Sequence, residues 1–168
     1  MFAINYRIVQ SEYDDFVGQH GFFQIKCNGH VYGEMYPKEI EDIMEKVPLY
    51  DWFERLAKVI QNLMTKDYVA LSDIESYNTW IVFQKRNEEV TISIVKAKKE
   101  SGSHDIEFAL SEPEVGEWTN QTINLEQLKQ EVIEKGREYI RKILAANKEK
   151  AIVEQIEQRF NEILQYLS

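Results

Sequence analysis

Cys27 and His30 are the residues whose types and spacing could support covalent or metal chemistry, because a thiolate beside an imidazole can act as a nucleophile or a metal-ligand pair. They lie in Gly21–Met35, GFFQIKCNGHVYGEM, shortly after His20. Asn28–Gly29 separates them, and this dipeptide favours a two-residue β-hairpin turn, which would make Cys27 and His30 cross-strand neighbours. The sequence offers no second Cys–His pair, no orienting group and no oxyanion hole. We therefore predict neither a catalytic residue nor a metal site here.

Other motifs that carry chemistry do not occur in the sequence. None of the glycines around the hairpin is followed by Lys-Ser or Lys-Thr, as a phosphate-binding loop requires. The patterns GxSxG and HExxH are missing. His104–Asp105 lies in the segment SGSHD, which is typical of a turn. Paired carboxylates are abundant, but without geometry they identify no acid and base. We predict a protein that is not an enzyme and needs no cofactor.

Acidic residues are the strongest functional signal. The 168 residues include 29 acidic and 20 basic ones, which gives a formal net charge of -9. Between Ser103 and Thr119 there is no Lys or Arg, and the candidate partner-binding residues in this segment are Asp105, Glu107, Glu112, Glu114, Glu117 and Trp118. A second concentration comprises Glu34, Glu39, Glu41, Asp42, Glu45, Asp51 and Glu54. Acidic patches with an aromatic anchor suit a basic protein partner, whereas the alternative is a solvated face over a core tryptophan.

Composition narrows the class of protein. Hydrophobic content of 43% and aromatic content of 12% are typical of one folded domain. The negative charge disfavours nucleic acid and anionic membranes as partners, because their phosphates would repel it. Solubility alone could also account for that charge. A single cysteine fits a reducing compartment, and no apolar run approaches the roughly 20 residues that span a bilayer. The amino-terminal residues do not resemble a signal peptide. We expect a cytoplasmic protein.

The elements that position these residues are predicted to form an α+β fold, with a mainly antiparallel sheet built from hairpins and covered by helices. The expected strands are Phe2–Gln10, the two halves of the Gly21–Met35 hairpin, Thr79–Lys85, Glu89–Lys98 and Asp105–Leu110; Lys66–Tyr77 also allows a strand. The hairpin register places Phe23 opposite Glu34. Arg86–Glu88 forms the loop of the second hairpin.

Two helices are predicted between the hairpins. After Pro37, apolar residues recur at helical spacing, namely Ile40, Ile43, Met44 and Val47. Pro48 ends this helix and begins a second one over Leu49–Met64. The second helix carries an apolar stripe that we expect to pack across the sheet: Trp52, Phe53, Leu56, Val59, Ile60 and Leu63.

The C-terminal section is predicted to be helical from Asn124, whose side chain can cap the first turn. One apolar stripe comprises Leu125, Leu128, Val132, Gly136, Tyr139, Ile140 and Ile143, and another comprises Ile152, Ile156, Phe160, Ile163 and Leu167. The second is rotated by roughly 130° from the first, which favours a break near Ala145–Lys148. We expect residues 1–147 to form one α+β domain. Residues 148–168 would form a helix that packs on this domain or mediates a homodimer through the second stripe.

Four stretches resemble the immunity proteins of bacterial polymorphic toxin systems. They are FAINYRIVQ, GFFQIKCNGHVYG, LYDWFERLAKVIQNL and the hairpin from TWIVFQK to EVTISIVKAK, within about two-thirds of the chain. The resemblance implies a small α+β protein that binds and neutralises a co-inherited toxin, often a nuclease, and it assigns no functional residue. The alternatives are a self-associating structural or adaptor protein, or a small-molecule binder, which would need a cavity of about 300 Å³ or more.

Overall fold

The first sheet contains the hairpin that Asn28–Gly29 predicts. In the computed structural model, which describes residues 1–167, its strands are β1 (Phe2–Ile8), β2 (His20–Cys27), β3 (His30–Gly33) and β4 (Val47–Pro48). β2 and β3 are antiparallel and place Cys27 opposite His30, as predicted. Asn28 and Gly29 have φ angles of 50° and 87°, which a type I′ turn requires. β1 and β4 both pair antiparallel with β2.

The second sheet is built on a longer hairpin. Its strands are β5 (Tyr68–Ser72), β6 (Thr79–Arg86), β7 (Glu89–Lys96), β8 (Ile106–Glu107), β9 (Glu114–Val115) and β10 (Gln121–Asn124). They lie in the order β10-β7-β6-β5-β8, with β9 beside β7. Arg86 pairs with Glu89, so the turn contains only Asn87 and Glu88 and is one residue shorter than predicted. The ambiguous segment after the first long helix does form a strand, β5.

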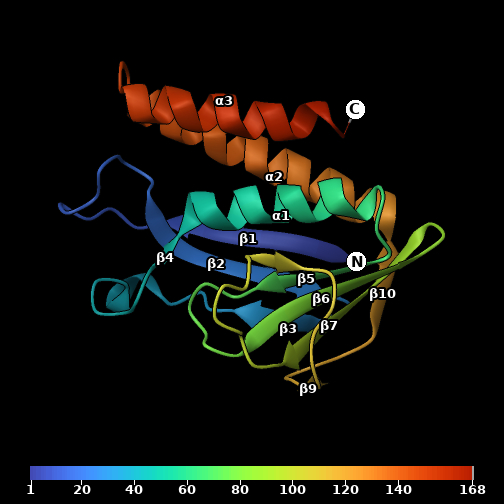
Figure 1. The fold of residues 1–168 in the computed structure, drawn as a ribbon. Helices are drawn as coiled ribbons and strands as arrows, with labels where there is room; N and C mark the ends of the chain where they lie inside the picture. Colours follow the sequence, from blue (N-terminus) through green and yellow to red (C-terminus); the bar gives the residue numbers. More distant parts are fainter. Residues whose placement is uncertain (168) are drawn as a thin grey trace.

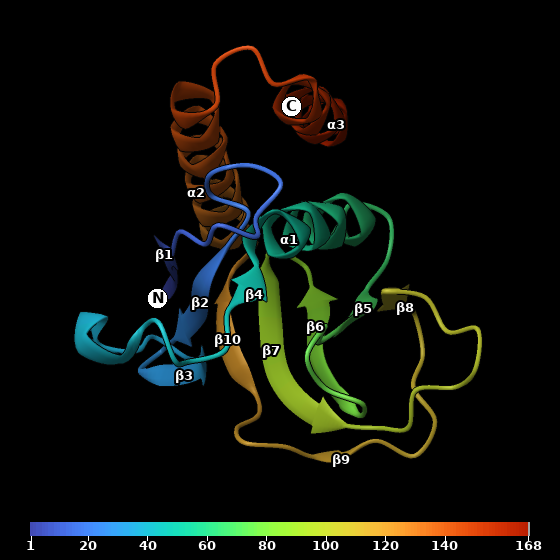
Figure 2. The same cartoon turned by 90° about the vertical axis from the view of Figure 1, so that its left-hand side faces the viewer.

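Only part of the strand predicted over Asp105–Leu110 is present. β8 pairs with β5 through Ile106 and Glu107 alone. The chain then leaves the sheet, and Leu110 packs against a small apolar cluster around Trp80 and Val82. Figure 2 shows the segment that carries β8 and β9 running around the outside of the second sheet. The alternating apolar residues of Asp105–Leu110 therefore extend the sheet only at β8, and beyond β8 the segment covers the sheet.

The helix predicted after Pro37 is wrong. Only a short 3-10 turn forms, η1 (Lys38–Ile40), and the Ile43 side chain is 82% exposed. Helices of this length gain most of their stability from burying an apolar face. Because Ile40 and Ile43 are both exposed, this segment gains no such burial. The segment instead forms a loop that connects β3 to β4 (Figure 1).

Three helices cover the sheets in two layers. They are α1 (Leu49–Leu63), α2 (Leu125–Ala146) and α3 (Ala151–Gln165). α1 packs on β2 and β5 and so bridges the two sheets, while α2 packs on β1 and β10. α3 lies over α1 and α2 (Figures 1 and 2). The predicted α+β class is thus confirmed. Within residues 1–167, no helix has both the length and the apolar character needed to cross a membrane.

The predicted break in the C-terminal section is confirmed between α2 and α3. The side chain of Asn147, which is buried, holds this break in place. Its amide oxygen accepts the Val17 backbone N–H at 2.8 Å. Its amide nitrogen donates to the carbonyl oxygens of Val17 at 2.8 Å and Ile143 at 2.7 Å. A single polar side chain therefore ties the end of α2 to the loop between β1 and β2.

The predicted self-association stripe lies mostly inside the chain. Four of its five residues are at most 9% exposed, namely Ile156, Phe160, Ile163 and Leu167. Ile152 is the exception, at 41% exposed. The Phe160 ring packs over Gly136 of α2, where a Cβ atom would lie 2.3 Å from Cζ. Of the two arrangements that the sequence left open, α3 therefore packs on its own chain. A dimer through this stripe would first require α3 to undock.

Candidate functional site

Cys27 and His30 face different environments. Cys27 is fully buried, and desolvation raises the pKa of its thiol, partly offset by the positive amino terminus. The His30 side chain is exposed, and its ring lies 5.7 Å from the ring of Trp118. The pair is thus a cross-strand contact with a thiol that stays protonated. Among the described residues 1–167, no three His, Cys, Asp or Glu side chains converge as metal ligands.

The acidic segment predicted to bind a partner does not form one patch. Asp105 pairs with Arg55 at 3.0 Å, and Glu107 accepts the backbone N–H of His104 at 2.7 Å. Glu112 and Glu114 are exposed on the outer segment. Among the six residues proposed from the sequence, Glu117 lines the pocket described below.

The sequence left two interpretations of Trp118 open, an aromatic anchor for a partner or a core residue, and its burial favours the core residue. Its side chain is 8% exposed, and its indole N–H donates to the carbonyl oxygen of Val31 at 3.0 Å. It therefore fastens the segment after β9 to the edge of β3. This hydrogen bond also places the neighbouring Glu117 against the first sheet, where it lines a pocket.

A pocket of about 280 Å³ lies where the first sheet, the start of α1 and three loops meet. Its apolar wall is largely aromatic and comprises Phe22, Phe23, Tyr32, Tyr36 and Trp52, with Ile25 and Val47. Its polar lining consists of five carboxylates: Glu34, Glu45, Asp73, Glu75 and Glu117. Gly33 completes the lining, which contains no Lys or Arg. Aromatic faces and carboxylates both attract cations, so the pocket suits an organic cation.

Packing and hydrogen bonds hold the aromatic wall in place. Phe23 of β2 stacks on Trp52 of α1, with ring centroids 5.3 Å apart and planes 9° apart. Trp52 is 4% exposed, and its indole N–H is buried without a hydrogen-bond partner among the described residues. The Tyr32 hydroxyl donates to the Asp73 carboxylate, which joins β3 to the loop after β5. The ring faces and the Asp73 carboxylate are therefore fixed before any ligand arrives.

The carboxylates give the pocket a strongly negative environment. Desolvation, followed by the carboxylates of Glu45 and Asp73, raises the pKa of Glu75, while His20 acts in the opposite direction. Burial, the hydrogen bond to Asp73 and the charge of Glu117 raise the pKa of the Tyr32 hydroxyl, which therefore stays a donor. Burial and neighbouring carboxylates thus both disfavour negative charge here, and a bound cation would relieve the repulsion of Glu75 by Glu45 and Asp73.

Cations lie nearby but outside the lining. The Lys99 ammonium donates to the backbone carbonyl oxygen of Asp73 at 2.6 Å and to that of Ser76. Desolvation lowers the pKa of Lys99, and the Asp73 charge opposes this shift. Lys99 bonds to backbone carbonyl oxygens, whereas the carboxylate of Asp73 accepts a hydrogen bond from the Tyr32 hydroxyl. Lys99 therefore offsets part of the Asp73 charge from outside the pocket lining.

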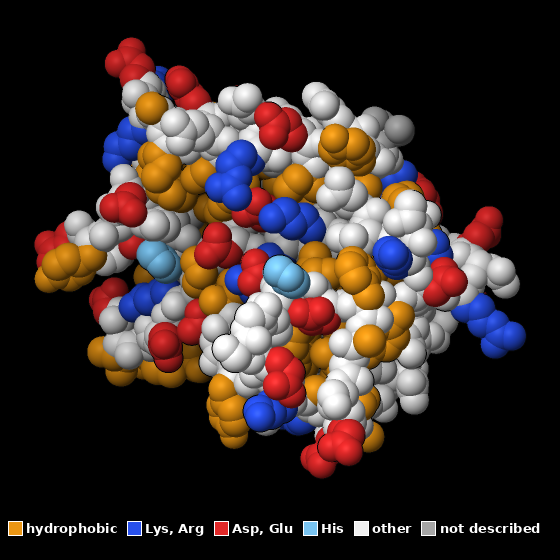
Figure 3. All heavy atoms as spheres, viewed as in Figure 1, with side chains coloured by type: hydrophobic (Ala, Val, Ile, Leu, Met, Phe, Trp, Pro, Cys, Tyr) orange, Lys and Arg blue, Asp and Glu red, His pale blue; other side chains and the backbone are white. Residues whose placement is uncertain are grey.

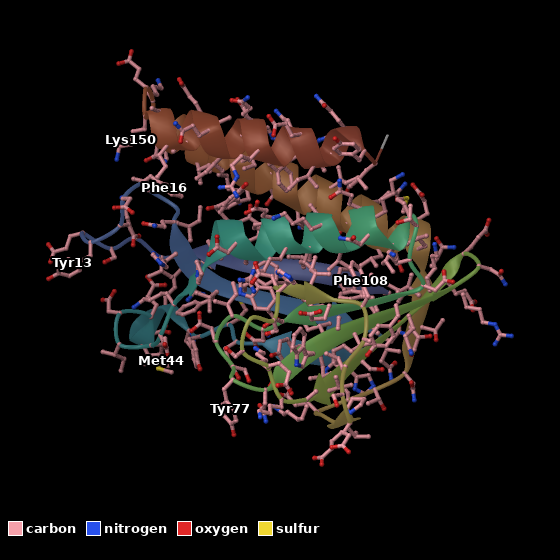
Figure 4. All side chains as sticks on the ribbon, viewed as in Figure 1. Tyr13, Phe16, Met44, Tyr77, Phe108 and Lys150 are labelled. Atoms are coloured by element: carbon pink, nitrogen blue, oxygen red, sulfur yellow. The ribbon has the colours of Figure 1, made fainter. Side chains whose placement is uncertain are left out.

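Exposed apolar side chains accompany the pocket mouth. They are Ile43, Tyr77 and Val115, which are 82%, 86% and 76% exposed. Each lies two residues from a pocket carboxylate: Glu45, Glu75 and Glu117 respectively. Two residues of chain span at most about 7 Å, so these side chains belong to the surroundings of the mouth. In Figure 3, hydrophobic and acidic side chains lie close together along the left and lower edges, with Lys and Arg side chains among them. Met44 and Tyr77 project from those edges in Figure 4.

The sequence pointed to parts of this pocket but did not assemble it. Glu117 belongs to the first predicted acidic group, and Glu34 and Glu45 belong to the second. Asp73 and Glu75 were not singled out. One usable signal was the predicted hairpin register, which sets Phe23 opposite Glu34. Both residues line the pocket. A scan against protein-family models, a search of curated proteins and a search of solved structures each found no match.

Proposed function

We propose that this protein is a non-enzymatic inhibitor that binds a basic protein, in the way that an immunity protein neutralises its toxin. The observation that carries the proposal is the pocket lined by five carboxylates and no Lys or Arg. It brings Glu117 of the first acidic segment together with Glu34 and Glu45 of the second. Exposed Ile43, Tyr77 and Val115 near the mouth supply the apolar contacts that a protein interface needs around its polar anchors.

Inhibition follows from covering the partner. A net charge of -9 steers a basic protein toward this surface and raises the association rate. If the partner is a nuclease, its active-site groove is positively charged because it binds phosphates. The carboxylates at the pocket would take the place of those phosphates and block access. No catalytic group of this chain is needed for such a function.

The test is protection of bacterial cells from the toxic product of the gene adjacent to the one for this protein. The pocket variant combines Glu34→Gln, Glu75→Gln and Glu117→Gln. The control variant combines Glu88→Gln, Glu134→Gln and Glu154→Gln, three exposed positions outside the pocket. Both variants lose three negative charges, so they change net charge equally.

The unaltered protein and the control variant should protect the cells and form a one-to-one complex with the toxin. The pocket variant should lose protection, and its affinity should fall by at least about tenfold. The affinity of the unaltered protein should also fall as salt rises. Equal protection by both variants, or weak binding that does not respond to ionic strength, would overturn the proposal.

A further inference from the structure

We infer that the pocket receives the side chain of an arginine from the basic partner. This inference rests on the proposed binding of a basic protein and names the group that the pocket recognises. Five carboxylates in a lining without Lys or Arg define the sign of the ligand's charge. Burial, followed by repulsion from Glu45 and Asp73, raises the pKa of Glu75, and a bound cation would offset that repulsion.

The size of the pocket favours a single side chain. Its volume of about 280 Å³ lies just below the range of roughly 300–1,000 Å³ that is usual for drug-sized ligands and cofactors. One long side chain with its polar end among the carboxylates fits such a space. The exposed side chains of Ile43, Tyr77 and Val115 would then contact the rest of the partner and exclude water around the inserted residue.

The aromatic wall favours guanidinium over ammonium. A guanidinium is planar, stacks on aromatic faces and loses its hydration more easily than the ammonium of lysine. Five aromatic residues line the pocket, and the stacked pair Phe23 and Trp52 is fixed by packing between β2 and α1. The Phe22 ring already has the Cζ of Arg7 5.1 Å from its centroid. A guanidinium can also bond two carboxylate oxygens at once, or two separate carboxylates. Asp73 is oriented for this by the Tyr32 hydroxyl.

The carboxylates come from separate segments, which suits several donors spread around one plane. Glu34 follows β3, Glu45 precedes β4, Asp73 and Glu75 follow β5, and Glu117 follows β9. Arginine presents five N–H donors in a fixed fork, whereas lysine presents three from one atom. The arrangement therefore matches arginine better than lysine.

The experiment titrates the protein with three small probes and follows the indole N–H signal of Trp52 by NMR. The probes are N-acetyl-arginine methylamide, the corresponding lysine derivative, and the citrulline derivative, which keeps the shape of arginine without its charge. Trp52→Phe assigns the signal among the three tryptophans. Glu75→Gln and Glu117→Gln test the carboxylates, and Glu88→Gln is the matched control. Urea unfolding confirms that each variant is folded.

The arginine probe should shift the Trp52 signal with a millimolar dissociation constant, and the lysine probe should bind at least about threefold more weakly. The citrulline probe should cause no shift. Each pocket variant should weaken arginine binding by about fivefold, and the control should not. No shift with the arginine probe, an equal shift with citrulline, or stronger binding of lysine would overturn the inference.

The two proposals fail in different ways. If the arginine probe binds in the pocket but the toxin does not bind the protein, the proposed function is wrong and the pocket assignment stands. If the pocket variants lose toxin binding but the arginine probe does not bind in the pocket, the proposed function stands and the arginine assignment is wrong.

Discussion

Replacing Gly136 with alanine tests how α3 is docked on the rest of the chain. An ideal Cβ at this position would lie 2.3 Å from Cζ and 3.0 Å from Cε1 of Phe160. Carbon atoms in unstrained contact lie about 3.5–4.0 Å apart, so the nearest atoms overlap by at least about 1.2 Å. The Phe160 ring is 1% exposed and cannot swing into solvent. Either the ring or the whole of α3 must therefore move.

The expected cost follows from two opposing contributions. Overpacking of this kind lowers the free energy of unfolding by about 1–3 kcal/mol. Alanine in place of glycine inside a helix raises it by about 1 kcal/mol. Gly136→Ala alone should therefore destabilise the protein by up to about 2 kcal/mol. The three closest atoms all belong to the far end of the Phe160 ring, and leucine lacks them. In a Phe160→Leu background, Gly136→Ala should become stabilising, by about 1 kcal/mol.

The assay is urea unfolding of the four proteins in this double-mutant cycle, with the urea dependence of the unfolding free energy checked for constancy. The coupling between the two positions should equal the cost of the clash, about 1–3 kcal/mol. If Gly136→Ala changes the free energy of unfolding by the same amount in both backgrounds, Phe160 does not cover Gly136. The docking of α3 described above would then be wrong.

Three further predictions concern single substitutions. Asn147→Ala removes a buried side chain that makes three hydrogen bonds and should lower the free energy of unfolding by about 2–3 kcal/mol in urea. Ile43→Asp should change that free energy by less than about 0.5 kcal/mol, yet weaken toxin binding in a pull-down. Glu75→Gln should raise it by only about 0.5 kcal/mol at pH 7, because Glu75 is exposed and the change removes a partly desolvated charge that Glu45 and Asp73 repel. Since the pKa of Glu75 is raised in the folded protein, its ionisation destabilises the fold as pH rises above the ordinary carboxyl value of 4.5. The gain should therefore vanish below that pH, and a gain that persists there would contradict the electrostatic cause.

Features governed by neighbouring residues could be predicted from the sequence. The register of the first hairpin follows from Asn28–Gly29, because two adjacent positive φ angles allow few other turns. The helix after Pro48 and the break before α3 follow from the spacing of apolar residues. The same spacing failed after Pro37, where the periodic residues Ile40 and Ile43 meet no packing partner. Periodicity shows what a segment could bury, and the fold decides whether a surface is available.

The pocket depends on contacts between distant segments, which no local pattern specifies. Three side-chain hydrogen bonds join the first hairpin to later segments of the chain. Trp118 bonds to Val31, Tyr32 bonds to Asp73, and Asn28 donates to the carbonyl oxygen of Thr122 at 3.0 Å. Each connects residues at least 41 positions apart. Trp118 illustrates the difficulty: beside acidic residues it resembles an exposed anchor, and only the fold shows that its indole is used internally.

The charge of Glu75 in the pocket works against folding, and this is the strongest reason to assign the pocket a function. The raised pKa of Glu75 means that its charged form is disfavoured in the folded chain. Exposure of the Ile43 and Tyr77 side chains to water beside the mouth also contributes no stabilisation to the fold. A folded chain that only needed solubility could space its carboxylates apart and keep apolar residues inside. A cationic partner with an apolar periphery would remove both penalties on binding. Relief of these penalties on binding would then contribute to the affinity for the partner. A binding site is expected to lower the stability of the free protein in this way.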